Sequence, residues 1–287
     1  MSQKNQMHEL PFQNLLERDL FQVYPISGFE NELSETAHRH NFYMLLWSTA
    51  GAGEHLIDFE PYTIRTNQVY FLRPGQVHQV KTFVEDGWLL VFEDTLLNTF
   101  TRRGTLEEQF AMFDYFNQHP YVQLNEEVEE VYTSLFRFLN KESRKEQANL
   151  AVVPYYVYLL LLHAHQLHLQ QHTQQQLPNH DLERLRDLRI LIERKYKEEH
   201  EMGYYVQKLG LSAKKLNEVT RHALGKTVHQ MLQERLLTES KYLLLASPLS
   251  VKEIAYELGF NDPAYFGRFF KKHTQLSPAS YKESRSK

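Results

Sequence analysis

Three histidines fall where a metal ion or a small ligand could be held. His38 and His40 are two residues apart just before a predicted strand, and His78 follows the Pro74-Gly75 turn. On extended chain, side chains at positions i and i+2 point the same way, and a third imidazole from a neighbouring strand could complete a metal-binding face. The same three imidazoles could instead line a ligand site that holds no metal.

A second set of residues has the chemistry needed to contact DNA. Two predicted helices near the C-terminus each present an outward polar face; the first comprises Lys214, Asn217, Glu218 and Arg221, and the second Ala264, Arg268, Lys271 and Lys272. Arginine can bond guanine through two hydrogen bonds, asparagine can bond adenine, and lysine typically meets phosphate. One charged helix face is usually only solvated, but two tandem copies with basic faces favour DNA contact.

Each of these helices follows the same local pattern of a short helix, a Leu-Gly turn and a capping residue. The turns are Leu209-Gly210 and Leu258-Gly259, and the two glycines are 49 residues apart. Glycine permits the positive φ that ends the first helix, and Ser212 and Asp262 can cap the second. This layout is the helix-turn-helix, in which the second helix lies in the DNA major groove.

A single helix is predicted between the two units, over Thr227–Ala246. A helix of this length spans about 30 Å, and successive major-groove faces lie about 34–36 Å apart. A rigid connecting helix would therefore place both outward faces on one side of the duplex.

The N-terminal part reads as short strands followed by helices. The candidate strands are separated by turn residues such as Gly51, Pro61 and Pro74-Gly75; they are Phe42–Ser48, His55–Phe59, Val69–Leu72, Val77–Phe83 and Trp88–Phe92. Regular turns between short strands predict an antiparallel sandwich or a small barrel. Helical spacing follows over Leu106–Phe116, Glu126–Asn140 and Leu150–Gln170.

The last of these helices carries two further features. His165, His168 and His172 share one face, which could be a metal-binding ladder but which we interpret as an ordinary polar face. Its wide apolar stripe needs a partner, which is either the barrel or a second subunit.

Length and composition limit the class of protein. The 287 residues indicate two domains, and the absence of cysteine excludes disulfides, thiolate zinc sites and cysteine nucleophiles. The polar N-terminus lacks the apolar core of a signal peptide, and the most apolar stretch, Tyr155 to Leu162, is far shorter than the ~20 residues of a spanning helix. We therefore expect a soluble, cytoplasmic protein that does not associate with membranes.

Charge divides the chain as the motifs do. Residues 1–180 carry a net charge of -10 and residues 181–287 a net charge of +6. A basic segment joined to an acidic one suggests that one part meets a polyanion. The boundary between the acidic and the basic segment lies in the glutamine-rich stretch QLHLQQHTQQQLPNH. We therefore predict a first domain over residues 1–170, a linker over 171–180 and a second domain over 181–287.

The segment from about Leu185 to Tyr281 resembles the DNA-binding domain of the AraC/XylS family of transcription regulators. The residues that carry the resemblance are Leu209-Gly-Leu-Ser, Gly225-Lys226-Thr227, Arg235, Glu253 to Phe260, Asp262, Tyr265-Phe266, Phe269 to Lys272, Ser277-Pro278 and Tyr281. The sequence departs from the family pattern at Gln275, where glycine is usual, and at Lys282, where arginine is usual.

The resemblance implies that the N-terminal half is a cupin-like domain that binds an effector and forms a dimer. Cupin barrels have a His-x-His motif with a glutamate a few residues on, and here Met44 and Leu45 occupy that place. We therefore favour an effector site without a metal. Its expected residues are His38, His40, Phe42, Trp47 and His78.

The predicted fold is α+β with two domains: a cupin-like antiparallel β-barrel with flanking dimerisation helices, and an all-α domain with two helix-turn-helix units. The predicted function is sequence-specific transcription regulation under the control of a small-molecule effector, with no enzymatic activity and no cofactor. The expected partners are double-stranded DNA, the effector and a second copy of the chain, with RNA polymerase as a further candidate. Two alternatives stay open: a cupin metalloenzyme that uses His38, His40 and His78 and is fused to a DNA-binding domain, and a DNA-binding protein that needs no effector.

Overall fold

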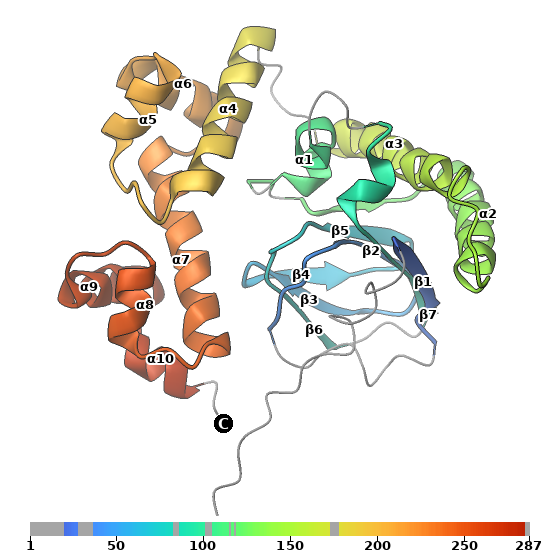
Figure 1. Cartoon of the computed structure of the whole chain (residues 1–287), viewed down its shortest axis with the longest axis horizontal. Coiled ribbons are helices and arrows are strands. Elements are labelled where there is room, and N and C mark those ends of the chain that lie inside the picture. Colours follow the sequence, from blue (N-terminus) through green and yellow to red (C-terminus); the bar gives the residue numbers. More distant parts are fainter. Residues whose placement is uncertain are drawn as a thin grey trace, which may run out of the picture. The chain divides into compact units, whose positions relative to one another are not determined.

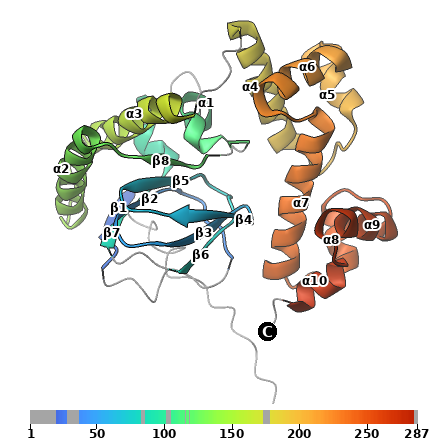
Figure 2. The same ribbon diagram turned by 180° about the vertical axis from the view of Figure 1, so that it is seen from behind.

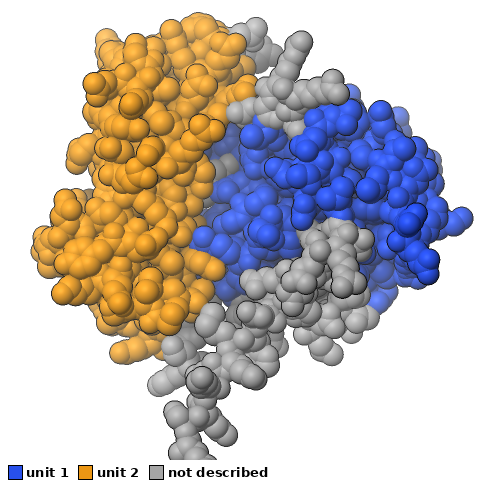
Figure 3. All heavy atoms as spheres, in the orientation of Figure 1, with its two compact units in different colours: residues 1–172 blue, residues 173–287 orange. Residues whose placement is uncertain are grey.

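The computed structural model of the chain divides into two compact units, Met1–His172 and Thr173–Lys287, which are coloured separately in Figure 3. It describes residues 20–27, 37–82, 86–100, 105–114, 116–117, 119–172 and 178–284. Within these ranges, no helix is both long enough and apolar enough to cross a membrane.

Unit 1 contains two antiparallel sheets (Figure 1). One has the strand order β1-β7-β2-β5-β8 and the other the order β4-β3-β6. The strands are β1 (Phe21–Pro25), β2 (Tyr43–Ala50), β3 (Gly53–Ile57), β4 (Glu60–Ile64), β5 (Gln68–Leu72), β6 (His78–Thr82), β7 (Asp86–Phe92) and β8 (Tyr121–Gln123). The predicted antiparallel β-structure is confirmed.

Alternation along β2 builds a core on each side of the larger sheet. Met44 and Leu46 belong to a cluster that also contains Ile57 of β3 and Val80 of β6, so this cluster lies between the two sheets. Leu45 and its odd-numbered neighbours belong to the other cluster, which includes side chains of α2 (Glu126–Ser143) and α3 (Val153–Gln171). These two helices therefore cover the outer face of the five-stranded sheet, as Figure 2 shows from behind.

The helix predicted over Leu106–Phe116 is wrong beyond its first turn. The structure has α1 (Leu106–Gln109) followed by the 3-10 turn η3 (Ala111–Phe113), and another 3-10 turn, η2, covers Asp94–Leu97. Phe110, Met112 and Phe113 are all buried. Phe110 and Phe113 have the i, i+3 spacing of one helix face, but Met112 does not share it, so a narrow stripe of a regular helix would not bury all three.

The face of α3 that carries His168 also differs from the prediction of an ordinary polar face. His168 is 1% exposed, and its Nε2 lies 3.2 Å from the carbonyl oxygen of His119. Burial lowers the pKa of His168 to about 4, so its ring is neutral at pH 7.

Unit 2 is all helical and is built from two helix-turn-helix pairs joined by α7. The helices are α4 (Asn179–Lys195), α5 (Met202–Leu209), α6 (Ala213–Leu224), α7 (Val228–Ala246), α8 (Val251–Glu257), α9 (Pro263–Thr274) and α10 (Pro278–Ser284). The helix α4 ends at Lys195, and the chain turns before α5. The predicted caps are confirmed: Ser212 accepts from the backbone of Lys215, and Asp262 from Ala264 and Tyr265.

The two residues that depart from the family pattern have clear structural surroundings. Gln275 ends α9 with a φ of 64°, and Gly225 ends α6 with a φ of 68°. A side chain in this left-handed region costs roughly 1–2 kcal/mol relative to the right-handed helix, whereas glycine visits it freely. Lys282 donates from Nζ to the carbonyl oxygens of Ser247 and Leu249, so it ties α10 to the end of α7.

The variant Gln275→Gly should stabilise the protein. Removal of the left-handed strain is partly offset by the greater flexibility of glycine in the unfolded chain, which leaves a gain of up to about 1 kcal/mol. The midpoint of thermal unfolding, followed by far-UV circular dichroism, should rise. The matched control, Gly225→Ala, introduces a side chain at the equivalent helix end and should lower it. A fall in the Gln275→Gly midpoint would contradict the strain argument.

Candidate nucleic-acid interface and ligand site

The helix α9 separates an apolar face from a basic one. Phe266, Phe269 and Phe270 are buried, as predicted. Ala264, Arg268, Lys271 and Lys272 are exposed. The guanidinium of Arg268 forms a long ion pair with Asp262, at 3.7 Å, and the two side chains are 69% and 58% exposed. Such an exposed pair is weak, so the guanidinium can reach another acceptor.

The corresponding helix α6 has the same division. Leu216 and Val219 are buried, whereas Lys214, Glu218 and Arg221 are exposed.

Asn217 differs from the other predicted contact residues of α6 because its amide serves the fold. Its Oδ1 accepts from the backbone nitrogen of Val228, the first residue of α7, at 3.0 Å. Its Nδ2 faces the sulfur of Met202 at 3.6 Å. A side chain that satisfies the start of α7 would have to leave this bond before it could read adenine.

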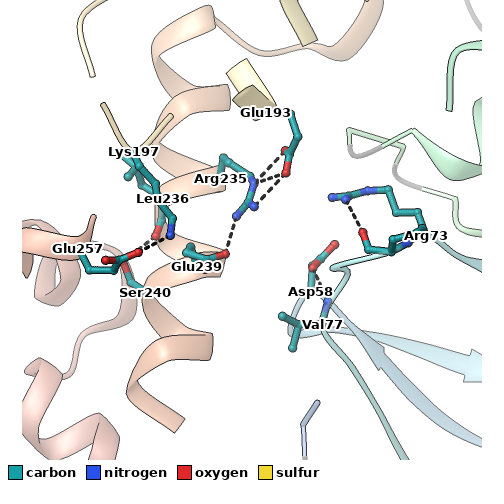
Figure 4. Close-up of polar contacts among 11 residues, drawn as sticks. Asp58, Arg73, Val77, Glu193, Lys197, Arg235, Leu236, Glu239, Ser240 and Glu257 are labelled. Atoms are coloured by element: carbon teal, nitrogen blue, oxygen red, sulfur yellow. Dashed lines mark hydrogen bonds and ion pairs between the residues drawn. The ribbon is translucent and has the colours of Figure 1, made fainter. Parts of the chain in front are cut away.

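A buried arginine joins the connecting helix to α4. Arg235 bonds both carboxylate oxygens of Glu193 through Nε at 2.9 and 3.2 Å, and Glu239 through Nη1 at 3.1 Å (Figure 4). Its guanidinium also lies 3.9 Å from the ring centre of Tyr196. Because a buried charge is tolerated only when it is paired and hydrogen-bonded, this group fixes α4 on α7.

In unit 1, the three predicted histidines lie together. The rings of His38 and His78 are 4.2 Å apart and those of His40 and His78 5.1 Å apart, measured between centroids. A fourth histidine, His55 of β3, joins them, with its Nε2 3.1 Å from Nδ1 of His78. The sequence signal for His55 was its place in a predicted strand at the same parity as Ile57, which faces the sheet interface.

The elements around the cluster fix its position. β3 pairs with β6 in antiparallel register, with His55 opposite Val80 and Ile57 opposite His78. The turn after β3 has positive φ at Asp58 and Phe59, and the carboxylate of Asp58 accepts from the backbone nitrogen of Val77 (Figure 4). This bond holds the turn beside the start of β6.

Three members of the cluster, His40, His55 and His78, are neutral at pH 7 and incompletely hydrogen-bonded. Burial, with a smaller effect of the neighbouring His38, lowers the pKa of His40 and His55 to about 3, and burial also lowers the pKa of His78 well below its usual value. His40 Nε2, His55 Nδ1 and His78 Nε2 are buried atoms without a hydrogen-bond partner. Each such atom costs about 1–3 kcal/mol, so polar groups of a ligand or water are favoured beside them.

The metal hypothesis finds no support in the arrangement of side chains. Among the residues that the structure describes, no three His, Asp or Glu side chains are placed to hold one ion. His40 Nδ1 lies 2.8 Å from the carbonyl oxygen of Phe42, which leaves only its other nitrogen for a ligand.

The two aromatic residues predicted for the ligand site lie on opposite faces of the larger sheet. Phe42 is buried between the sheets, where its ring stacks on His40 with centroids 4.1 Å apart. Trp47 is buried on the other side, against Tyr132 and Phe136 of α2. The structure therefore places Phe42, but not Trp47, beside the histidines.

Comparison with protein families gives two matches that together span most of the chain. Residues 22–156 match the model described as an AraC-like ligand binding domain, and residues 205–284 match a helix-turn-helix domain.

Curated relatives match across both units. The transcriptional activator RhaS of Escherichia coli O81 is 24% identical over 251 residues, which are 86% of this chain and 87% of that protein. The uncharacterised HTH-type transcriptional regulator YfiF of Bacillus subtilis is 21% identical over 267 residues, 91% of this chain and 83% of that protein.

Two solved structures are also similar. ToxT from Vibrio cholerae is 13% identical with a TM-score of 0.47, and the match covers 91% of this chain and 97% of ToxT. The C-terminal domain of the response regulator yesN from Fusobacterium nucleatum is 30% identical with a TM-score of 0.32, and the match covers 33% of this chain and 93% of that domain.

Acidification should destabilise unit 1 through the histidine cluster. The pKa of His40 and His55 is about 3 in the folded protein and about 6.5 in an unfolded chain, so the unfolded chain binds more protons between these pH values. Each of the two histidines should then remove about 1.4 kcal/mol of unfolding free energy per pH unit as the pH falls below about 6.5. Trp47 and Trp88 are the only tryptophans of the chain, so their fluorescence in urea at about pH 7 and about pH 5 reports on unit 1.

The variant His55→Gln should reduce the pH dependence of the unfolding free energy by the contribution of one histidine, about 1.4 kcal/mol per pH unit. The control His163→Gln, on α3 and outside the cluster, should leave it unchanged. Equal pH dependence in the wild type and His55→Gln would show that the cluster is not what titrates.

Proposed function

Since the chain belongs to the AraC/XylS family of transcription regulators, with an AraC-like ligand binding domain followed by a helix-turn-helix domain, we propose that α6 and α9 read DNA and that the histidine cluster binds the effector. The observation that carries the DNA proposal is the pair of exposed, mainly basic faces on two equally capped 12-residue helices. The proposed domains are residues 1–170 for effector binding and dimerisation, 171–180 as linker and 181–287 for DNA binding.

The proposed contacts divide by chemistry. Arg268 would bond guanine O6 and N7, with the small residue Ala264 letting α9 approach the base edges. Lys271, Lys272 and Lys214 would meet phosphates, and Arg221 and Glu218 would lie at the groove from α6. Since α7 has 19 residues, it spans about 28 Å, which is close to one turn of duplex.

The proposed effector site combines the imidazoles of His38, His40, His55 and His78 with the apolar surroundings of Phe42. Neutral imidazoles both donate and accept, so they suit a small molecule that carries hydroxyl or carbonyl groups beside an apolar part. The three unpartnered ring nitrogens support this assignment.

The proposal assigns no catalytic step to the chain, and the relatives that it matches are transcriptional regulators. A cupin metalloenzyme would need a set of metal ligands that the described residues do not offer. We place the protein in the cytoplasm, with the DNA that it reads. RNA polymerase is proposed as a partner only because the chain is proposed to regulate transcription.

A homodimer through α3 completes the proposal. The apolar stripe that suggested a dimer is largely used inside unit 1, because Val157, Leu160 and Leu161 are fully buried. A second apolar line remains on the outside of the helix: Tyr155, Leu159, Leu162 and Leu169 are between 38% and 54% exposed. Their three- and four-residue spacing along one helix face suits a two-fold contact with the same face of a second copy.

The variant Arg268→Ala should lose base discrimination without losing the fold. Binding by the full chain would be measured on a duplex selected from a random pool and on each single-base variant of that duplex. Preference at one or two positions should fall by about 1–3 kcal/mol, with an unchanged circular dichroism spectrum. The control Lys272→Ala should weaken binding to every variant alike. Equal weakening by Arg268→Ala would assign this residue to a phosphate instead.

The double variant Leu159→Glu with Leu162→Glu should be monomeric, because two carboxylates would be buried in the proposed contact. Light scattering of the wild type at tens of micromolar should give the mass of a dimer. The control, Leu159→Met with Leu162→Met, keeps the face apolar and should stay dimeric. A monomeric wild type, or a dimeric glutamate variant, would remove α3 as the interface.

A further inference from the structure

The connector between α4 and α5, residues 196–201, belongs by sequence to the first helix-turn-helix unit but lies against the second. Lys197 Nζ contacts Glu257 at 2.7 Å, as Figure 4 shows. His200 Nε2 lies 2.9 Å from the carbonyl oxygen of Leu258, in the turn between α8 and α9. The connector therefore bonds both the side chains and the backbone at this turn.

Close approach at this point requires a glycine. A Cβ on Gly259 would lie 1.7 Å from the carbonyl oxygen of Lys197 and 3.3 Å from Nε2 of His200. Gly210, the equivalent residue of the first turn, has a similar φ of 63° against 78°, but a Cβ there would have nothing within 4 Å. Both turns need glycine for their backbone, and only the second needs it for contact with another segment.

The connector is fixed at its other end as well. Glu193, in the last turn of α4, is bonded by the buried Arg235 of α7, and Tyr196 lies under the same guanidinium. The ring of His200 also contacts that of Phe260, with centroids 4.9 Å apart. The chain from Glu193 to His200 thus runs from the middle of α7 to the second turn.

We infer that the connector sets the position of α9 relative to α6, with Gly259 and His200 as its positioning residues. The second helix-turn-helix is also held by the bonds of Lys282, which join α10 to the end of α7. The connector adds contacts at the other end of α8, so α8 and α9 cannot rotate about α7 without breaking them. Since α6 and α9 are the proposed reading helices, this inference rests on the proposed function: the connector fixes the spacing of the two DNA windows.

The test is a selection of duplex DNA by the full chain, from a pool with two random windows separated by spacers of different length. The wild type should select one spacing, and so should Gly210→Ala, which carries the backbone strain of an alanine but no clash. Gly259→Ala should select several spacings or lose preference in the second window. His200→Ala, which removes the bond to Leu258 without adding an atom, should broaden the spacing in the same direction.

One selected spacing in both Gly259→Ala and His200→Ala, equal to that of the wild type, would overturn the inference. A wild type that selects no sequence would instead overturn the proposed function. In that case amide hydrogen exchange tests separately whether the connector holds α8 and α9. Exchange in these two helices should be several-fold faster in Gly259→Ala and in His200→Ala than in Gly210→Ala. Equal exchange in the three variants would again overturn the inference.

Discussion

The arrangement of unit 2 depends on one buried cation. The side chain of Arg235 is 7% exposed and lies in the middle of α7, where it bonds Glu193 of α4 and Glu239 of its own helix. The cost of desolvating a guanidinium is met only when its donors are bonded, so α4 has one favourable position on α7. At the other end of α4, the buried carboxylate of Asp181 bonds Lys215 of α6. The helix α6 is thus attached to α7 through α4, and the connector that follows α4 continues to the turn before α9.

The two units meet opposite physical demands. Unit 2 has exposed basic faces, and its buried Arg235 is paired with Glu193 and Glu239. Unit 1 hides polar imidazoles between two sheets and leaves three of their nitrogens without partners. Unpartnered atoms on the buried, neutral rings of His40, His55 and His78 are costly for folding alone. They therefore support the proposal that this cluster is the effector site.

Local rules were enough to predict much of unit 2. The caps at Ser212 and Asp262 and the positive φ at the two turn glycines follow from residue type and spacing alone. The strands β1, β4 and β8 were missed; each lies at the edge of its sheet, where its place is set by pairing with a single neighbouring strand. The connector after α4 could not be foreseen, because it is fixed by a contact with residues about sixty positions away. Trp47 could have been placed, since its odd separation from Phe42 puts the two on opposite faces of one strand.

The central claim is that α6 and α9 enter neighbouring stretches of the major groove together. Hydroxyl-radical footprinting of the full chain on a duplex selected from a random pool tests this claim directly. Two protected windows should appear on one face of the duplex, about 10 base pairs apart from centre to centre. A single protected window, or uniform weak protection along the duplex, would contradict it.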